Sequence, residues 1–326
     1  SLISGPCSAE THSQVLQTAE GLQGLPLSYF RAGIWKPRTQ PGAFEGIGDI
    51  GLEWLVDVRN TFGYKICTEV ATAEHVKAAI AHQIDMVWIG ARSTVNPFTV
   101  QEIAEALQGS GIPVMVKNPV NPDLKLWIGA IERLERHDIK VIGAIHRGFS
   151  VYQKTKYRNN PHWQIAIDFK QERPDIPLIM DPSHIGGRAA LIAPLAQQAL
   201  DLHYDGLMIE THCDPSAALT DAKQQISPAE LHDLFTALEP RSQSERIKHD
   251  LSELRDKLSI VDDALIELLQ ERMALSKQIG IFKRTHNTPI LQVQRWEETL
   301  KTSVEKGLLS GLSQEFTEQF IKMLHE

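Results

Sequence analysis

The feature that most constrains the fold of this chain is an eightfold alternation of short apolar runs with stretches of helical length. The runs lie between residues 2 and 238 and read LISGP, LSYFRAG, YKICTE, DMVWIGA, PVMVKN, KVIGAI, PLIMD and GLMIE. Segments such as 74–81, 100–108 and 124–137 separate them. Buried strands that alternate with helices are typical of parallel sheets, so the pattern predicts an α/β fold with a (β/α)8 TIM barrel. An open doubly wound sheet is the alternative, although the chain has no GxGxxG or Walker motif to favour it.

Each of the eight runs ends in, or leads into, residues that carry chemistry. In run order these are Cys7; Arg31 and Lys36; Glu69; Arg92; Lys117; His146 and Arg147; Asp181 and His184; and Glu210. The carboxyl ends of barrel strands form one face, where the active sites of this fold are built. Because five of the residues are arginine or lysine, we expect a site for a multiply anionic ligand on this face.

The second run leads into a basic loop, RAGIWKPRTQPGAFEG, at residues 31–46. No helix or strand period fits this stretch, and its prolines favour a loop. Its cations and hydroxyl suit a small phosphorylated or carboxylated ligand, since lysine offers a point charge and arginine a planar fork. These residues are Arg31, Lys36, Arg38 and Thr39. A solvated basic loop is the alternative interpretation.

A second group combines a thiol, an imidazole and two carboxylates, which are ligands for a divalent metal such as Mn, Fe, Co or Zn. Its members are Cys7, His184, Glu210 and Asp221. In a closed barrel the eighth strand lies beside the first, so residues that follow runs seven, eight and one can converge. The alternative is an inert buried thiol at Cys7 and a locally hydrogen-bonded imidazole at His184.

The composition argues against several classes of protein. The net charge is −8 and there is no basic run, which argues against nucleic-acid binding. Three cysteines in 326 residues argue against a disulfide framework. The sequence has neither an apolar run of membrane-spanning length nor an amino-terminal basic-then-apolar signal, so we expect a cytoplasmic protein without membrane contact.

Five motifs carry a resemblance to a known family: GPCSAE (5–10), KPRT (36–39), GAR (90–92), DPSH (181–184) and Glu210 with LTDAKQ (219–224). Together they resemble the type I 3-deoxy-D-arabino-heptulosonate-7-phosphate (DAHP) synthases of the compact microbial branch, over residues 2–238. The resemblance implies that the metal is bound by Cys7, His184, Glu210 and Asp221. It implies that phosphoenolpyruvate is held by Arg31, Lys36, Arg92, Lys117 and Arg147, and the phosphate of erythrose 4-phosphate by Arg38 and Thr39.

The implied reaction is an aldol-like condensation of phosphoenolpyruvate with erythrose 4-phosphate to DAHP and phosphate, the first step of the shikimate pathway. A Lewis-acid metal would stabilise charge on the aldehyde oxygen, and fixed cations would hold two repelling anions together. The candidates for proton transfer are Lys36, Asp181 and His184. The nearest rival is the synthase that joins phosphoenolpyruvate to arabinose 5-phosphate on a similar barrel, and the KPRT form of the loop argues against it.

After the polar stretch EPRSQS the pattern changes to long helices. We expect a barrel domain at 1–238, a linker at 239–244 and a small all-α domain at 245–326. Apolar residues keep an alternating three-four spacing along a first helix of about 40 residues. This seam consists of Leu251, Leu254, Leu258, Val261, Leu265, Leu268, Leu275, Ile279 and Phe282. A helix of that length needs a partner helix, so we expect a homodimer.

The seam has one charged position, Arg272, for which two interpretations stay open. A buried arginine can set the register of a coiled coil at a cost in stability. Alternatively, the seam opens into a pocket whose anionic ligand pairs with Arg272, with Arg255 and Lys283 at its border. A second helix after Pro289 carries Arg295, and a third is expected to follow the N-cap Ser313.

The segment LRDKLSIVDDALIELLQERMALSKQIGIFK resembles the all-helical chorismate mutases. The resemblance implies an intertwined, metal-free dimer that rearranges chorismate to prephenate, with cations on the two carboxylates and Lys283 donating to the ether oxygen. Arg272, Lys283 and Arg295 would form the pocket, and Arg255 would come from the partner. Trp296 departs from the family, many members of which carry a carboxylate there. The chain is also expected to end at Glu326 within an uncapped helix, short of where relatives place a second ether-oxygen donor.

The combined expectation is a bifunctional enzyme that dimerises through its helical domain, with pairing of dimers into tetramers left open. The alternative keeps the synthase and makes the helical domain a non-catalytic dimerisation and ligand-sensing module. Because the linker lets the helical dimer move relative to the barrels, we expect prephenate to act as an effector that inhibits the synthase.

Overall fold

The computed structural model describes residues 1–36, 42, 44–152, 155–241, 245–289 and 292–325. It divides the chain into two compact units, Ser1–Arg241 and Ser242–Glu326. Arg38 and Thr39, two of the predicted substrate-binding residues, lie outside the described residues. The three cysteines are all free thiols, two of them buried.

The first unit is a closed barrel of parallel strands that pair in chain order, with β8 returning to β1. Each predicted apolar run overlaps one strand: β1 (Leu2–Gly5), β2 (Leu27–Arg31), β3 (Ile66–Val70), β4 (Met86–Ile89), β5 (Val114–Lys117), β6 (Val141–His146), β7 (Leu178–Met180) and β8 (Gly206–Glu210). The barrel prediction is therefore confirmed, and the open doubly wound sheet is wrong.

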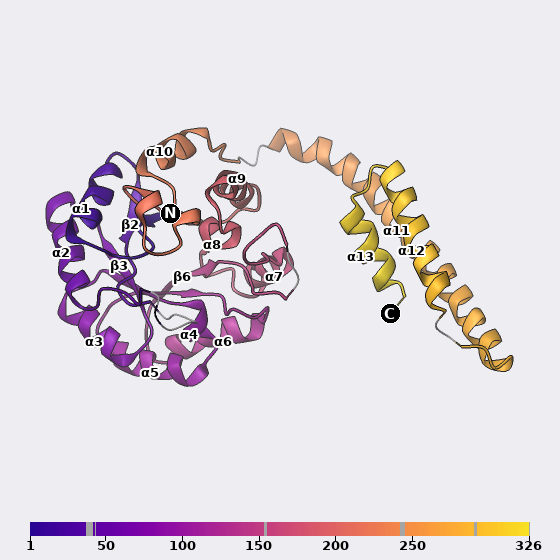
Figure 1. The fold of residues 1–326 in the computed structure, drawn as a ribbon, viewed down its shortest axis with the longest axis horizontal. Coiled ribbons are helices and arrows are strands. Elements are labelled where there is room, and N and C mark those ends of the chain that lie inside the picture. Colours follow the sequence, from indigo (N-terminus) through magenta and orange to yellow (C-terminus); the bar gives the residue numbers. More distant parts are fainter. Residues whose placement is uncertain (37–41, 43, 153–154, 242–244, 290–291, 326) are drawn as a thin grey trace. The chain divides into compact units, whose positions relative to one another are not determined.

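Helices surround the barrel, as Figure 1 shows. They are α1 (His12–Gly21), α2 (Ile50–Phe62), α3 (Ala73–Ala81), α4 (Ala91–Thr94), α5 (Pro97–Leu107), α6 (Leu124–Glu135), α7 (Trp163–Glu172), α8 (Pro182–Gly186), α9 (Ile192–Asp201) and α10 (Pro228–Ala237). Short 3₁₀ turns lie at Ala189–Leu191, Pro215–Ala217 and Ala222–Gln224. The main apolar core lies between these helices and the strands.

A separate core fills the inside of the barrel. Its buried members are Ile3, Cys67, Met86, Trp88, Met115, Ile145, Ile179 and Met208. Trp88 is the largest of them, and its ring lies 5.0 Å from the Arg31 guanidinium and 5.8 Å from the Lys117 ammonium. The inside of the barrel is thus a packed core, and its Trp88 ring contacts the cations of Arg31 and Lys117.

Local sequence determines where α8 begins and ends. Asp181 is its N-cap and accepts a hydrogen bond from the backbone N–H of His184 at 3.0 Å, and Pro182 occupies the first helical position. Gly187 ends the helix in the left-handed region at φ 68°. This one-turn helix follows β7 directly, so it presents His184 at the carboxyl end of the barrel.

The second unit contains three helices, α11 (Glu245–Thr285), α12 (Val293–Leu309) and α13 (Gln314–Met323). Ser313 accepts a hydrogen bond from the N–H of Phe316, so its prediction as an N-cap is confirmed. The expected helix through the end of the chain is wrong, because α13 ends at Met323 with Leu324 as its C-cap. No helix among the described residues is both long enough and apolar enough to cross a membrane.

Candidate active site and metal centre

A cavity of about 450 Å³ lies at the carboxyl ends of the barrel strands. Its lining is rich in charged side chains: Lys36, Glu69, Arg92, Lys117, Arg147, Arg158, His184 and Asp221. A larger cavity of about 700 Å³ lies at the amino ends of the strands, but tyrosines and apolar side chains dominate its lining, with Lys65 and Asp205. The charged cavity is the candidate active site, because it holds the convergent polar groups on the face where this fold builds catalytic sites.

A thiol and two carboxylates meet at one side of this cavity. One ligand atom from each of Cys7, Glu210 and Asp221 lies within 4.8 Å of the others. The register of the barrel explains the meeting, since Gly5 of β1 pairs with Glu210 of β8 and Cys7 follows Gly5 by two residues. Asp221 reaches the same point from the loop after β8, where its backbone has φ 48°, a conformation that is uncommon for a residue other than glycine.

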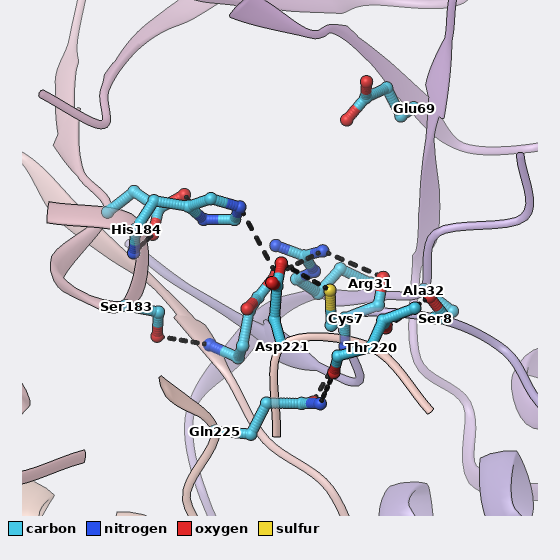
Figure 2. Close-up of polar contacts among 12 residues, drawn as sticks. Cys7, Ser8, Arg31, Ala32, Glu69, Ser183, His184, Thr220, Asp221 and Gln225 are labelled. Atoms are coloured by element: carbon cyan, nitrogen blue, oxygen red, sulfur yellow. Dashed lines mark hydrogen bonds and ion pairs between the residues drawn. The ribbon is translucent and has the colours of Figure 1, made fainter. Parts of the chain in front are cut away.

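His184, the fourth predicted metal ligand, borders this cluster but is not among the three residues whose ligand atoms lie within 4.8 Å of one another. Its Nδ1 lies 2.8 Å from Asp181 Oδ2, and its Nε2 lies 3.7 Å from Glu210 Oε1. Figure 2 shows the side chains of Cys7, Arg31, His184 and Asp221 directed toward one another, with Glu69 set apart. A carboxylate on the far nitrogen is the usual support of a metal-binding imidazole.

These residues fit a divalent metal ion on two grounds. Glu210 Oε1 is buried and accepts no hydrogen bond from the described residues, although the Arg31 guanidinium lies 3.2 Å away, so the oxygen can still be a ligand of an ion. Burial and the nearby Glu210 carboxylate raise the pKa of the Cys7 thiol to about 12, so in the protein alone it is a neutral thiol. A bound cation would favour the thiolate and add the soft ligand that Mn, Fe, Co or Zn accept beside imidazole and carboxylate.

Three predicted cations are paired with acids of the site. Arg31 Nη2 lies 3.2 Å from Glu210 Oε1, and Lys117 Nζ lies 3.0 Å from Asp181 Oδ2, with all four side chains buried. Lys36 Nζ donates to Cys7 Sγ at 3.1 Å. Burial alone would raise the pKa of Asp181, but His184 and Lys117 hold it well below its usual range. The predicted metal ligands and these three predicted cations therefore form one continuous network.

The other two cations predicted to bind phosphoenolpyruvate, Arg92 and Arg147, also line the cavity. Burial lowers the pKa of Arg147 to about 10, and the neighbouring cations Arg158 and Arg92 add to the effect although Asp181 opposes it. Arg147 Nη1 also donates to Asn159 Oδ1 at 2.8 Å. A cluster of cations that disfavours its own charge is a site that an anion would stabilise.

Two residues that contact the thiol–carboxylate cluster were not predicted as site residues, although one of them, Gln224, ends the LTDAKQ motif. Arg158 and Gln224 both lie in segments without helix or strand periodicity, and both hydrogen-bond to carboxylates of the thiol–carboxylate cluster. Glu69 was noted only as a residue at a strand end, and its Oε2 accepts a hydrogen bond from Trp88 Nε1 at 3.0 Å.

In the helical unit, the structure describes all four predicted pocket cations. Arg272 is half-buried and its Nη1 donates to the backbone carbonyl of Leu324 at 3.0 Å. Lys283 lines a cavity of about 430 Å³ together with Ile279, Phe282 and Thr288. Arg255 and Arg295 are exposed, and Arg295 lies 3.5 Å from Glu298.

The fold and the site define a TIM barrel with a cavity lined by charged side chains beside a thiol–carboxylate cluster, followed by a helical domain. Residues 1–244 match the family model described as "DAHP synthetase I family", and residues 254–326 match "Chorismate mutase type II". The chain belongs to the DAHP synthetase I family and carries a carboxyl-terminal chorismate mutase type II domain. Both resemblances stated from the motifs are confirmed.

Individual relatives support the barrel assignment. A phospho-2-dehydro-3-deoxyheptonate aldolase of Thermotoga maritima is 31% identical over 225 residues, covering 69% of this chain and 64% of the relative. The chain thus spans less than two thirds of that relative's length. A 2-dehydro-3-deoxyphosphooctonate aldolase of Wolinella succinogenes is 29% identical over 260 residues, covering 71% of this chain and 94% of the relative. The crystal structure of a Thermotoga maritima DAHP synthase matches with a TM-score of 0.66 and 27% identity, covering 79% of this chain and 70% of that one.

Proposed function

We propose that the barrel catalyses the condensation of phosphoenolpyruvate with erythrose 4-phosphate to DAHP and phosphate, and that the helical domain rearranges chorismate to prephenate. The observation that carries the first activity is the junction of cations with the thiol–carboxylate cluster at one cavity. Two anions that repel each other must be brought together for this reaction, which is the task such a cavity suits. Membership of the DAHP synthetase I family supports the same reaction.

In this proposal the carboxylate and phosphate of phosphoenolpyruvate bind to Arg31, Lys36, Arg92, Lys117 and Arg147, and the phosphate of erythrose 4-phosphate binds to Arg38 and Thr39. The enol C3 attacks the aldehyde carbon, water adds at C2 and phosphate leaves. Cys7, His184, Glu210 and Asp221 would hold the divalent ion, which when bound supplies Lewis acidity to the aldehyde oxygen.

The protonation states favour different roles for the three proton-transfer candidates. The low pKa of Asp181, held by His184 and Lys117 against the effect of burial, keeps it an anion, so it serves as an acceptor that orients its two neighbours. Lys36 remains the donor, since its ammonium lies 3.1 Å from Cys7 Sγ at the junction of the metal ligands and the cations. His184 serves as a metal ligand rather than as an acid.

The competing aldehyde is arabinose 5-phosphate, because several relatives are 2-dehydro-3-deoxyphosphooctonate aldolases. The KPRT loop and the DAHP synthetase family model favour the four-carbon sugar. Comparison of kcat/KM for the two aldehydes decides between them, and a preference for arabinose 5-phosphate would overturn this choice.

For the helical domain, we propose a homodimer through the seam of α11, with tetramers left open. Eight of the nine seam residues have described side chains, and each of these is between 47% and 63% exposed in the single chain. A row of exposed apolar side chains this long is stabilised when it packs against another apolar surface, and a second copy of the same helix supplies such a surface. Within the dimer, Arg272, Lys283 and Arg295 would bind chorismate together with Arg255 of the other subunit. The alternative is a sensor that binds prephenate or chorismate without turnover.

The proposal has three broader parts. The domains are 1–238 and 245–326, with 239–244 as the linker, and the division of the chain after Arg241 supports this boundary. The three free thiols support a cytoplasmic location. Prephenate is the effector that inhibits the synthase.

One preparation assayed for both reactions, with and without a chelator, tests the proposal. We expect chelation to abolish DAHP formation and to leave chorismate turnover intact. Synthase activity that survives complete metal removal would contradict the metal centre. Prephenate binding without chorismate turnover would favour the sensor.

A further inference from the structure

Two side chains tie the carboxylates of the proposed metal centre to each other. Arg158 Nη1 donates to Asp221 Oδ1 at 3.0 Å and also hydrogen-bonds to Gln224 Oε1. Gln224 Nε2 donates to Glu210 Oε2 at 2.7 Å. The chain of contacts therefore runs from one carboxylate to the other through Arg158 and Gln224.

The contacts use one oxygen of each carboxylate and leave the other facing the cluster. Asp221 Oδ2 lies 3.6 Å from Cys7 Sγ, while Oδ1 is held by Arg158. Glu210 Oε1 faces Arg31 and His184 and accepts no hydrogen bond from the described residues, while Oε2 is held by Gln224. In both acids the partner thus selects which oxygen is available to a cation.

The backbone of Arg158 is fixed to the helix that carries His184. The N–H groups of Arg158 and Asn159 both donate to the Ile185 carbonyl, at 3.0 and 3.3 Å, and Asn159 Nδ2 donates to the His184 carbonyl at 2.7 Å. Gly187 permits this close approach, since a Cβ there would lie 2.4 Å from Arg158 Cβ. The guanidinium is therefore presented from a defined position, although its side chain is 45% exposed.

Gln224 connects the contact at Asp221 to the contact at Glu210, so the two contacts depend on each other. It is 1% exposed, and both ends of its amide are used, one toward Glu210 and the other toward Arg158. Loss of Arg158 would leave the amide oxygen of Gln224 without this partner in a buried position. Loss of Gln224 would in turn free Glu210 Oε2 to compete for the ion.

We propose that Arg158 and Gln224 form a strap that positions Asp221 and Glu210 so that each offers one oxygen to the divalent ion. The strap rests on the metal centre of the proposed function, but it assigns a role to two residues outside the ligand set. Both are positioning residues, since they act through the carboxylates.

The test is Co²⁺ binding to the full-length, metal-free protein, measured by competition with a chromophoric chelator and by the visible absorption of the bound ion. The variants are Arg158→Met, Arg158→Lys, Gln224→Met and the Arg158→Met/Gln224→Met double. Arg188→Met is the matched control, because Arg188 is an exposed arginine close to the same helix. Thermal unfolding of each metal-free variant checks the fold.

We expect Arg158→Met to weaken Co²⁺ binding by about 10- to 100-fold and to shift the Co²⁺ absorption bands, with partial recovery in Arg158→Lys. The double variant should lose less affinity than the product of the two single effects, because each single change already breaks the strap. Arg188→Met should bind as the wild type does.

Three results would overturn the strap. The first is unchanged affinity and spectrum in Arg158→Met. The second is a pair of single effects that multiply in the double variant, which would make the two residues independent. The third is a raised KM for a phosphorylated substrate with unchanged Co²⁺ affinity, which would make Arg158 a direct substrate contact. Absence of Co²⁺ binding by the wild type would instead refute the metal centre itself, and the strap with it.

Discussion

At the residue scale, Glu210 shows how a fully buried acid stays ionised in this barrel. Burial alone would raise the pKa of its carboxyl, but His184, Arg31 and Lys36 lower it below the usual value. Asp221 follows the same rule, since burial would raise its pKa while Arg158, His184 and Lys36 lower it to about 2. Both acids are therefore anions at neutral pH even when no metal ion is bound, which is the charge state that a metal ligand requires.

The first prediction concerns the thiol of the cluster. Cys7→Ser should abolish synthase activity and retention of the metal, because serine replaces the one soft ligand with a hydroxyl. Bound metal per chain, measured by elemental analysis after gel filtration, is the readout, with DAHP formation beside it. Chorismate turnover should be unaffected.

Cys67→Ser is the matched control for this change, since Cys67 is equally buried but belongs to the core inside the barrel. It should keep the metal while losing about 1 to 3 kcal/mol of stability from the buried hydroxyl. An active Cys7→Ser enzyme with a full complement of metal would eliminate Cys7 as a ligand.

The second prediction concerns pH and His146. This imidazole is fully buried, with Nδ1 at 2.8 Å from the Tyr204 hydroxyl and Nε2 at 2.7 Å from the Pro161 carbonyl. Burial lowers its pKa from the ordinary 6.5 to about 4. Between these values the unfolded chain binds a proton that the folded barrel does not, so stability is highest above pH 6.5 and falls as the pH drops toward 4.

From this group alone we expect a loss of about 2 kcal/mol in unfolding free energy between pH 7.5 and 5. Urea unfolding of the wild type and of His146→Asn at both pH values isolates the effect, because other titrating groups are common to the two proteins. The variant is expected to be less stable throughout but to depend less on pH. Equal pH dependence in the two proteins would show that His146 is protonated in the folded barrel.

At the element scale, the alternation of apolar runs predicts the strands well because strands buried on both faces are apolar along their whole length. The residues that follow the runs are predicted to share one face because parallel strands of a barrel all end there. The strap could not be predicted in this way. Arg158 and Gln224 lie in irregular segments, and their contacts depend on how the loops after β6 and β8 cross above the barrel. Loop paths of this kind leave no periodic signal in a sequence.

In the helical domain the helix could be predicted from the sequence, but the role of one residue in it could not. The three-four spacing predicts α11 and its length correctly, but a single sequence cannot state whether a charged seam position is a register device or a ligand contact. In the single chain Arg272 hydrogen-bonds to the Leu324 carbonyl at the end of α13. This contact joins the seam to the third helix and is compatible with either role.

The third prediction separates those roles. Arg272→Ala should reduce chorismate turnover by about 100-fold or more, since in the proposal it removes a cation that helps to hold the substrate carboxylates in the reactive conformer. Dimerisation should persist, because an alanine at one seam position keeps the coil. Absorbance of chorismate and sedimentation of the protein provide the two readouts, with the exposed Arg284→Ala as control. Dissociation into monomers would identify Arg272 as a register residue and favour the sensor interpretation.

At the scale of the whole molecule, fusion of these two domains gives little reason for channelling, because chorismate lies several chemical steps beyond DAHP. Control is a better reason. If the helical domains form the proposed dimer, a ligand that prefers one arrangement of this dimer shifts the arrangement of the attached barrels by the same free energy. The prediction that follows is inhibition of the synthase by prephenate, and its loss when the residues after Leu238 are removed.

The design of the truncation matters, because residues just beyond Leu238 contact α9. Glu239 exchanges two hydrogen bonds with Gln197, at 3.0 and 3.1 Å, and Arg241 lies 2.6 Å from Asp201. A chain that ends after Arg241 keeps these contacts, so comparison of the two truncations separates loss of regulation from damage to the barrel.

Both truncated proteins should be insensitive to prephenate, whereas a lower basal rate of DAHP formation is expected mainly in the shorter one. The measurement is the rate of DAHP formation against prephenate concentration for the three proteins. A flat response of the full chain, with prephenate binding established by calorimetry, would eliminate coupling through this ligand.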